Sequence, residues 1–189
     1  MKIKKIIDVC KKEGRLTLIS DTEGGPQWIE AKGARFALVG VPPVTLAGLC
    51  ALYDIDPEEG FAVDEIFGKI QLKGDEPLTM LPMRIDVGSV YVPFKANDGT
   101  VYQINQKYLA PFAKDREISC ILKRDDYGAP ALVFKAGLSE IAEVAPIIPT
   151  EEHISMLETI LSGADDFLSA EEQRTKKLPD LNYEEEVLR

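Results

Sequence analysis

Four lysines near the start of the chain are the residues best suited to contact a ligand: Lys4, Lys5, Lys11 and Lys12. Lysine side chains neutralise phosphate groups, so a helix that presents them outward can bind the backbone of a nucleic acid. The sequence therefore predicts a candidate phosphate-contacting face on this first segment. The opposing interpretation is an ordinary solvated helix face, which the net charge of −10 favours because nucleic-acid-binding domains are usually basic.

Acidic residues form three adjacent pairs, Asp64-Glu65, Asp75-Glu76 and Asp125-Asp126. Neighbours on a helix point to different faces, and acidic pairs in turns are normally solvated, so these pairs predict no acid–base site. Two catalytic carboxylates drawn from distant parts of the chain remain an open alternative, because a sequence does not reveal which acids meet in space.

Other catalytic signatures are absent from the sequence. His153 is the only histidine, and the chain contains no glycine-rich phosphate loop, serine elbow or zinc-binding histidine motif. The three cysteines, Cys10, Cys50 and Cys120, are odd in number and too far apart for a C-x-x-C metal site. We therefore predict no catalytic, cofactor-binding or metal-binding residues, no cofactor, and a protein that is not an enzyme.

The composition is that of a globular protein. Of the 189 residues, 45% are hydrophobic and 29% are charged, which argues against a disordered or membrane-embedded chain. Ile6-Ile7 is followed at once by Asp8, so the basic start lacks the apolar core of a secretory signal, and no run is long enough to span a membrane. With unpaired cysteines, these features predict a cytoplasmic protein without membrane contact.

Charge is distributed unevenly along the chain. Residues 151–189 contain 11 acidic and 4 basic residues, a net charge of −7, whereas residues 1–150 contain 21 and 18, a net charge of −3. An acidic end is usually a solvated face or tail, and its alternative role is to bind a basic partner.

Hydrophobic spacing predicts the elements that would position the charged residues. Apolar residues from Ile3 to Cys10 recur at helical intervals, so the four lysines belong to an amphipathic helix that ends at Gly14. A small antiparallel meander is predicted next, with strands over residues 15–20, 27–31 and 34–39. Two more helices follow, one capped by Thr45 and one over residues 62–71.

The second half is predicted to be rich in strands. Residues 72–82 contain two prolines and a glycine and are expected to be a connection. Asn97-Asp98-Gly99 is a strong hairpin-turn signal, and Asn105 can cap a single helical turn. The predicted strands cover residues 84–95, as one long strand or two short ones kinked at Gly88, and residues 100–104, 117–123, 131–135 and 141–145. A last helix is expected from Thr150 to Gly163.

These elements predict an α+β fold in which antiparallel β-sheet packs with two or three helices. Residues 1–149 form the predicted globular domain, and the alternative is a division into two similar subdomains that meet near residues 73–83. Residues 150–189 are predicted to contribute a C-terminal helix and an acidic, partly flexible tail.

Two resemblances extend this interpretation. The segment GGPQWIEAKGARFALVGVPPVTLAGLCALYDID (24–56) resembles a segment of uncharacterised phage-associated bacterial proteins, in which a tight turn, a strand and a short helix follow in this order. That resemblance implies a prophage setting and no established activity. Residues 101–149 resemble the second half of a DNA sliding-clamp domain, which implies an acidic ring with basic helices lining its hole.

The sequence therefore predicts a non-catalytic binding or assembly protein of prophage-like origin that acts through protein–protein contacts. The first alternative is a sliding-clamp-like, DNA-associated factor. It requires a closed oligomer and DNA binding that weakens with salt and when the four lysines become glutamates. The second alternative is a carboxylate-dependent enzyme, which requires a concave pocket where several acids converge.

Overall fold

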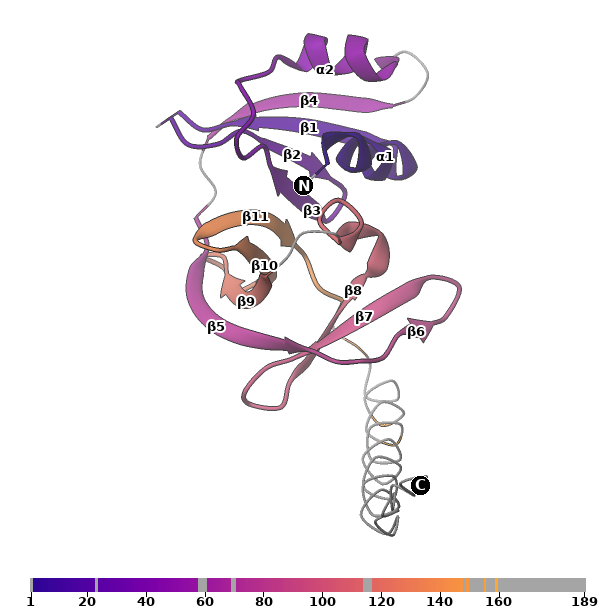
Figure 1. Cartoon of the computed structure of the whole chain (residues 1–189), viewed down its shortest axis with the longest axis vertical. Coiled ribbons are helices and arrows are strands. Elements are labelled where there is room, and N and C mark those ends of the chain that lie inside the picture. Colours follow the sequence, from indigo (N-terminus) through magenta and orange to yellow (C-terminus); the bar gives the residue numbers. More distant parts are fainter. Residues whose placement is uncertain are drawn as a thin grey trace, which may run out of the picture. The chain divides into compact units, whose positions relative to one another are not determined.

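The computed structural model describes residues 2–22, 24–57, 61–68, 71–113, 117–147, 149, 155 and 159 of the chain. The chain divides into two units, Met1–Ile148 and Pro149–Arg189, and all elements named below belong to the first. Among the described residues this unit has an α+β fold, in which a mostly antiparallel sheet of eleven strands packs with two α-helices (Figure 1). The helix and tail predicted over 150–189 lie outside the described residues, apart from helical Ser155 and Thr159.

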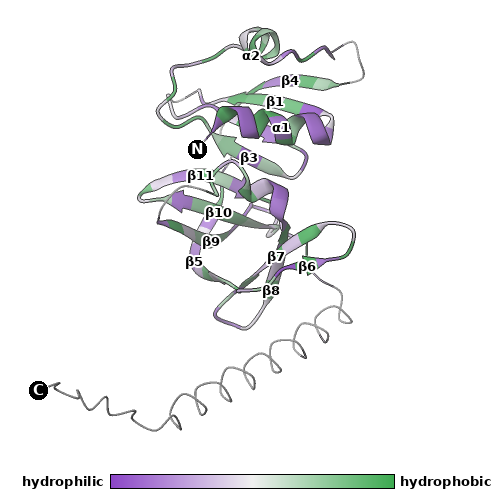
Figure 2. Cartoon of the chain, turned by 45° about the vertical axis from the view of Figure 1, so that its right-hand side comes forward, coloured by the Kyte–Doolittle hydropathy of each residue, from purple (hydrophilic) through white to green (hydrophobic). Residues whose placement is uncertain are grey.

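The first helix, α1 (Ile3–Glu13), forms as its apolar spacing predicts. It buries Ile6, Ile7, Val9 and Cys10, whereas its exposed residues are all charged, so the helix has a hydrophilic outer side (Figure 2). Gly14 ends the helix in the left-handed conformation, with φ at 67°. Its N–H donates to the carbonyls of Cys10 and Lys11 in the last turn. Glycine adopts this conformation without the steric cost that other residues incur.

The predicted meander is confirmed. Strands β1 (Arg15–Ser20), β2 (Trp28–Ala31) and β3 (Ala34–Ala37) pair in sequence as antiparallel neighbours. The turn between the last two strands contains Gly33, which has a φ of 83°. The Tyr108 hydroxyl donates a 2.6 Å hydrogen bond to the Lys32 carbonyl of the same turn.

The second helix, α2 (Leu46–Tyr53), begins where its cap predicts. The Thr45 hydroxyl accepts a hydrogen bond from the Gly48 N–H at 3.1 Å. The segment leading into the helix is fixed by Gln27, whose side-chain amide accepts from the Val44 N–H at 2.7 Å and donates to the Val44 carbonyl at 2.9 Å. The oxygen and the nitrogen of the Gln27 side-chain amide thus bond the backbone of Val44 as a neighbouring strand would, at the point where the chain leaves the sheet.

The helix predicted over residues 62–71 is wrong. Residues 62–67 form strand β4 (Ala62–Phe67), which lies parallel to β1. Val63, Ile66 and Phe67 are β-branched or aromatic and favour extended backbone. Because α2 lies in the connection between β3 and β4, the chain can return to pair with β1 in the parallel direction.

The connection predicted over residues 72–82 is also wrong, because it contains strand β5 (Lys73–Met80). The glycine that suggested a break, Gly74, lies in an irregular stretch of the β5–β9 register and has a φ of 101°. Pro77 lies opposite Ile121 of β9, and the pairing of β5 with β7 begins only at Thr79. Proline is tolerated there because only one side of the strand is paired. The residues 73–83 that suggested a subdomain boundary therefore include a strand of the sheet.

The remaining strands follow the predicted pattern closely. Their bounds are β6 (Ile85–Asp86), β7 (Val90–Lys95), β8 (Val101–Asn105), β9 (Ile118–Arg124), β10 (Pro130–Ala136) and β11 (Ser139–Val144). The segment 84–95 divides around Gly88, where φ is 85°. In the hairpin turn after β7, the Thr100 N–H donates to Asp98 at 2.8 Å. Asn105 caps the short 3₁₀ helix η2 (Gln106–Leu109) by accepting from the Lys107 N–H at 3.0 Å.

The strands form one sheet in the order β4-β1-β2-β3-β11-β10-β9-β5-β7-β6, and β8 pairs with β7. The antiparallel β3–β11 pair joins the meander to the second half of the chain. One face carries the main apolar core, in which the Phe134 ring contacts those of Phe94 and Phe112 at centroid distances of 5.6 and 5.0 Å. None of the helices in the described part of the chain is long and apolar enough to cross a membrane.

Candidate functional site

Five residues form a row across neighbouring strands on one face of the sheet. The strand register places Asp64 of β4 opposite Thr17 of β1, Thr17 opposite Glu30 of β2, Glu30 opposite Arg35 of β3, and Arg35 opposite Glu143 of β11. We call these five residues the polar row. Because successive side chains of a strand point to opposite faces, the row lies on the face opposite the main apolar core.

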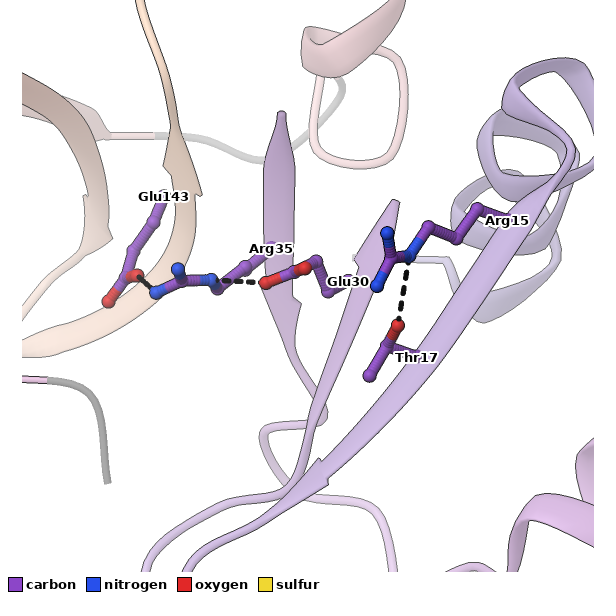
Figure 3. Close-up of polar contacts among 5 residues, drawn as sticks. All are labelled: Arg15, Thr17, Glu30, Arg35 and Glu143. Atoms are coloured by element: carbon purple, nitrogen blue, oxygen red, sulfur yellow. Dashed lines mark hydrogen bonds and ion pairs between the residues drawn. The ribbon is translucent and has the colours of Figure 1, made fainter. Parts of the chain in front are cut away.

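Arg35 joins the middle of the polar row to its end (Figure 3). Its Nε lies 2.6 Å from a carboxylate oxygen of Glu30, and a terminal nitrogen lies 3.1 Å from Glu143. Opposite charges that face each other across strands stabilise a sheet. At the other end, the Arg15 Nε donates to the Thr17 hydroxyl at 3.4 Å (Figure 3).

Glu143 is the most buried acid of the row, with only 9% of its surface exposed. Burial raises the pKa of its carboxyl above the ordinary value, and the adjacent Arg35 guanidinium opposes this shift. Burial is the larger effect because a carboxylate loses most of its water shell when it leaves solvent. Glu143 is therefore an acid that takes up a proton more readily than an exposed glutamate.

A hollow of about 610 Å³ lies beside Glu143. Its lining includes Ile19 and Trp28, together with the acidic residues Asp21 and Glu140. Glu140 pairs with the Lys123 ammonium group. The hollow thus combines an indole ring with three acids from distant parts of the chain, a convergence that the sequence did not reveal.

The adjacent acidic pairs do not form sites of their own. Asp64 and Glu65 are successive residues of a strand and point to opposite faces. Asp125 accepts the backbone N–H groups of its own turn, and Asp126 forms an exposed 2.6 Å ion pair with Lys73. These contacts agree with the expectation that neighbouring acids in turns cap backbone groups or are solvated.

Strand β4 forms one end of the sheet, and its only pairing among the described residues is with β1. The Ala62 N–H donates to the Gly14 carbonyl at 3.0 Å, and the Gly68 N–H donates to Ser20 at 3.1 Å. In a parallel pair every second residue bonds the same neighbour. The N–H and C=O groups of Val63, Glu65 and Phe67 therefore point away from the sheet, toward the open side of β4.

The end of β4 also exposes large apolar side chains. Figures 1 and 2 show α2 beyond β4 on the side away from β1, yet Ile66 is 46% exposed and Phe67 is 68% exposed. Val63, at the start of the strand, instead packs against the main core. The open side of β4 is thus most accessible at its acidic centre and its apolar end.

The four lysines singled out from the sequence lie on α1. Lys4, Lys11 and Lys12 are exposed, Lys5 is half-buried, and the exposed acid Asp8 lies among them on the same side of the helix. The Lys11 ammonium donates to the Asp54 carbonyl at 3.2 Å, next to the end of α2. This geometry brings the lysines together on one helix, and contact with phosphate stays a prediction.

The described part of the chain offers neither a thiol that is ionised at neutral pH among its two buried cysteines nor a cluster of metal ligands. Burial raises the pKa of Cys10 to about 12 and raises that of Cys120 even further, so both thiols are protonated at neutral pH. Cys120 lines an apolar hollow of about 430 Å³ together with Phe94 and Phe112. Among the described residues no three histidine, cysteine or acidic side chains are grouped to hold a metal ion.

No protein-family model, curated protein or solved structure matches this chain. The resemblances to phage-associated proteins and to sliding-clamp domains therefore stay predictions from the sequence.

Proposed function

We propose that this chain is a non-catalytic protein-binding module, and that it captures an extended segment of its partner along the open side of β4. The observation that carries the proposal is the outward direction of the backbone groups of Val63, Glu65 and Phe67 in a largely exposed strand. An extended segment that adds to a sheet edge gains main-chain hydrogen bonds, and side-chain contacts then select its sequence.

The side chains of β4 support an edge that is used for binding. A strand edge with exposed apolar residues promotes aggregation unless charge or cover protects it. Asp64 and Glu65 supply charge at the middle of the strand, while Ile66 and Phe67 leave apolar surface for a partner. This combination permits association with a matching segment and discourages indiscriminate pairing.

The proposal is tested by selecting binders from a displayed library of random twelve-residue peptides. Glu65→Pro removes the outward N–H at the centre of β4, and its ring blocks an added strand while the bonds to β1 are kept. We expect selected peptides to bind the wild-type chain and to lose binding to this variant. Glu65→Gln keeps the N–H and is the matched control, for which binding should remain detectable. Peptides that bind Glu65→Pro as well as wild type would contradict capture by β4.

A second candidate, a carboxylate-dependent enzyme, is favoured by the 610 Å³ hollow. Asp21, Glu140 and Glu143 line it, and a buried acid with a raised pKa can serve as a proton donor. A panel of chromogenic aryl glycosides and aryl phosphates would test this function. Turnover by the wild type that is lost in Glu143→Gln would support it, and a panel without turnover would count against it.

A further inference from the structure

We infer that the segment captured by β4 carries two consecutive basic residues, followed or preceded by two apolar residues. This inference rests on the proposed function and names the chemistry of the partner. It comes from the order of residues along the open strand, where the acids Asp64 and Glu65 are followed by Ile66 and Phe67.

The alternation of side chains between the two faces of the sheet determines which residues of β4 an added strand would contact on each face. On the face of the polar row, its side chains would lie beside Asp64 and Ile66. On the other face they would lie beside Glu65 and Phe67, because successive residues alternate between faces. Two neighbouring residues of the partner therefore meet the two acids, one on each face, and the next two meet the apolar pair. Opposite charges and apolar pairs across neighbouring strands are the favourable combinations.

Both acids at the centre of β4 are available to a cation from a partner. Glu65 is exposed, and it forms no ion pair with any other described residue. Asp64 lies 3.5 Å from Arg15, with side-chain exposures of 54% and 46%, so the pair is weak in water. Glu30 and Glu143, farther along the polar row, already share Arg35. The unmet negative charge of the row is thus concentrated at the strand that is open.

A second copy of this chain is a poor occupant. When two β4 strands pair antiparallel about a twofold axis, each residue at the axis faces its own copy. The two registers with the largest overlap are centred on Asp64 or on Glu65, and either places an acid directly opposite the same acid. Like charges that face each other across strands are destabilising. Self-pairing therefore requires a shifted register with fewer hydrogen bonds.

The acidic end of the chain is an equally poor occupant, because residues 151–189 carry a net charge of −7. They would meet the same repulsion at Asp64 and Glu65. The net charge of −10 for the whole chain instead attracts basic segments over long distances and accelerates their encounter. Charge complementarity thus points to a basic segment of another protein.

The experiment compares two displayed peptide libraries that differ only at their centre, Lys-Arg in one and Asp-Glu in the other, with all flanking positions random. We expect the wild-type chain to enrich the Lys-Arg library about tenfold more than the Asp-Glu library, because two partly exposed charge pairs each contribute a few-fold. The double variant Asp64→Lys/Glu65→Lys should reverse this preference. Apolar residues should be enriched beside the basic pair, and Phe67→Ser should remove that enrichment.

The outcomes separate this inference from the proposed function. Equal enrichment of both libraries, lost in Glu65→Pro, would overturn the basic partner while keeping β4 as the binding edge. If the wild-type chain enriched neither library more than Glu65→Pro does, both the basic partner and the binding edge at β4 would be overturned. A wild-type dimer in light scattering that dissociates in Glu65→Pro would assign the edge to a second copy and overturn the basic partner. Enrichment of basic peptides that persists in Glu65→Pro would place the charge preference at another surface and overturn both.

Discussion

Among the described residues, strands β4 and β8 both lack a second full-length partner strand, and of the two only β8 has its outer groups bridged by another segment. The Gln103 N–H donates to the Ile147 carbonyl at 3.1 Å, and the Ile147 N–H donates to the Gln103 carbonyl at 2.7 Å. Gln103 itself is only 7% exposed. No corresponding bridge satisfies the outer groups of β4 among the described residues.

Their side chains explain why one strand needs cover and the other does not. The sequence of β8, Val101 to Asn105, contains no charged residue, whereas β4 has two acids at its centre. Uncharged strand edges pair readily with other chains, and charged residues discourage this. Among the described residues, the edge without charge is bridged by another segment, whereas the edge that carries two acids is not.

Proline substitution at the outward N–H of each strand should give the largest difference between them. Gln103→Pro removes a used donor and leaves the Ile147 carbonyl without its partner, so we expect a loss of about 2–3 kcal/mol in the free energy of unfolding. Glu65→Pro removes a donor that has no acceptor among the described residues and should cost less than about 1 kcal/mol. Urea denaturation measures both.

The matched control for this pair is Asp64→Pro, which removes a hydrogen bond to β1 one residue away. It should destabilise the protein far more than Glu65→Pro. If the two β4 variants lost equal stability, the assignment of inward and outward groups along this strand would be wrong.

Removing the arginines that bond the two ends of the polar row should give the next largest difference in the free energy of unfolding. Arg35→Met leaves Glu143 buried without its cation, and we expect a loss of about 2 kcal/mol at neutral pH, because an unpaired buried charge is costly. Arg15→Met, at the open end of the row, should cost less than about 1 kcal/mol, because its ion pair with Asp64 is exposed and its hydrogen bond to Thr17 is long at 3.4 Å. The double variant Arg35→Met/Glu143→Leu should recover much of the loss in thermal or urea unfolding.

The pH dependence of stability tests Glu143 directly. Its pKa in the folded chain lies above the ordinary value of 4.5, so the folded state holds this proton more tightly than the unfolded state. The stability from this group is fully present below the ordinary pKa and is lost as pH rises through the raised pKa. Glu143→Gln lacks this loss. Its stability relative to wild type should therefore increase from pH 4 toward pH 7, and a constant difference across that range would contradict the raised pKa.

Local signals predicted the elements whose ends are determined by nearby residues. The apolar spacing before Gly14, the Thr45 cap, the turn at Asn97 to Gly99 and the Asn105 cap each specify structure within a few residues. The helix predicted at 62–71 failed because Ala62 to Phe67 fits either periodicity, and pairing with the distant β1 decides between them. Residues 72–82 failed because Gly74 and Pro77 are accommodated in a strand that is irregular and paired on one side there.

The surface around the polar row was harder to predict from sequence. Asp21, Glu140 and Glu143 line one hollow only because β3 pairs with β11, a contact between residues more than a hundred positions apart. The alternation of Glu30 and Arg35 across a tight turn does signal a cross-strand pair, and it could have located part of the row. The open side of β4 could not be anticipated without first identifying β4 as a strand.

Neutralising the acids of β4 should produce the smallest effect, and it tests whether charge keeps this edge open. In Asp64→Asn/Glu65→Gln, the two registers that place acids opposite themselves are no longer repulsive, while the outward hydrogen-bonding groups and Ile66 and Phe67 remain. We expect weak self-association that grows with protein concentration in light scattering, against a wild-type mass that stays nearer the monomer value of 20.9 kDa. Adding Glu65→Pro in place of Glu65→Gln should abolish the association, because the edge can then no longer pair. If the neutral variant stayed as monomeric as the wild type, repulsion between the acids would not be what distinguishes β4 from the covered β8.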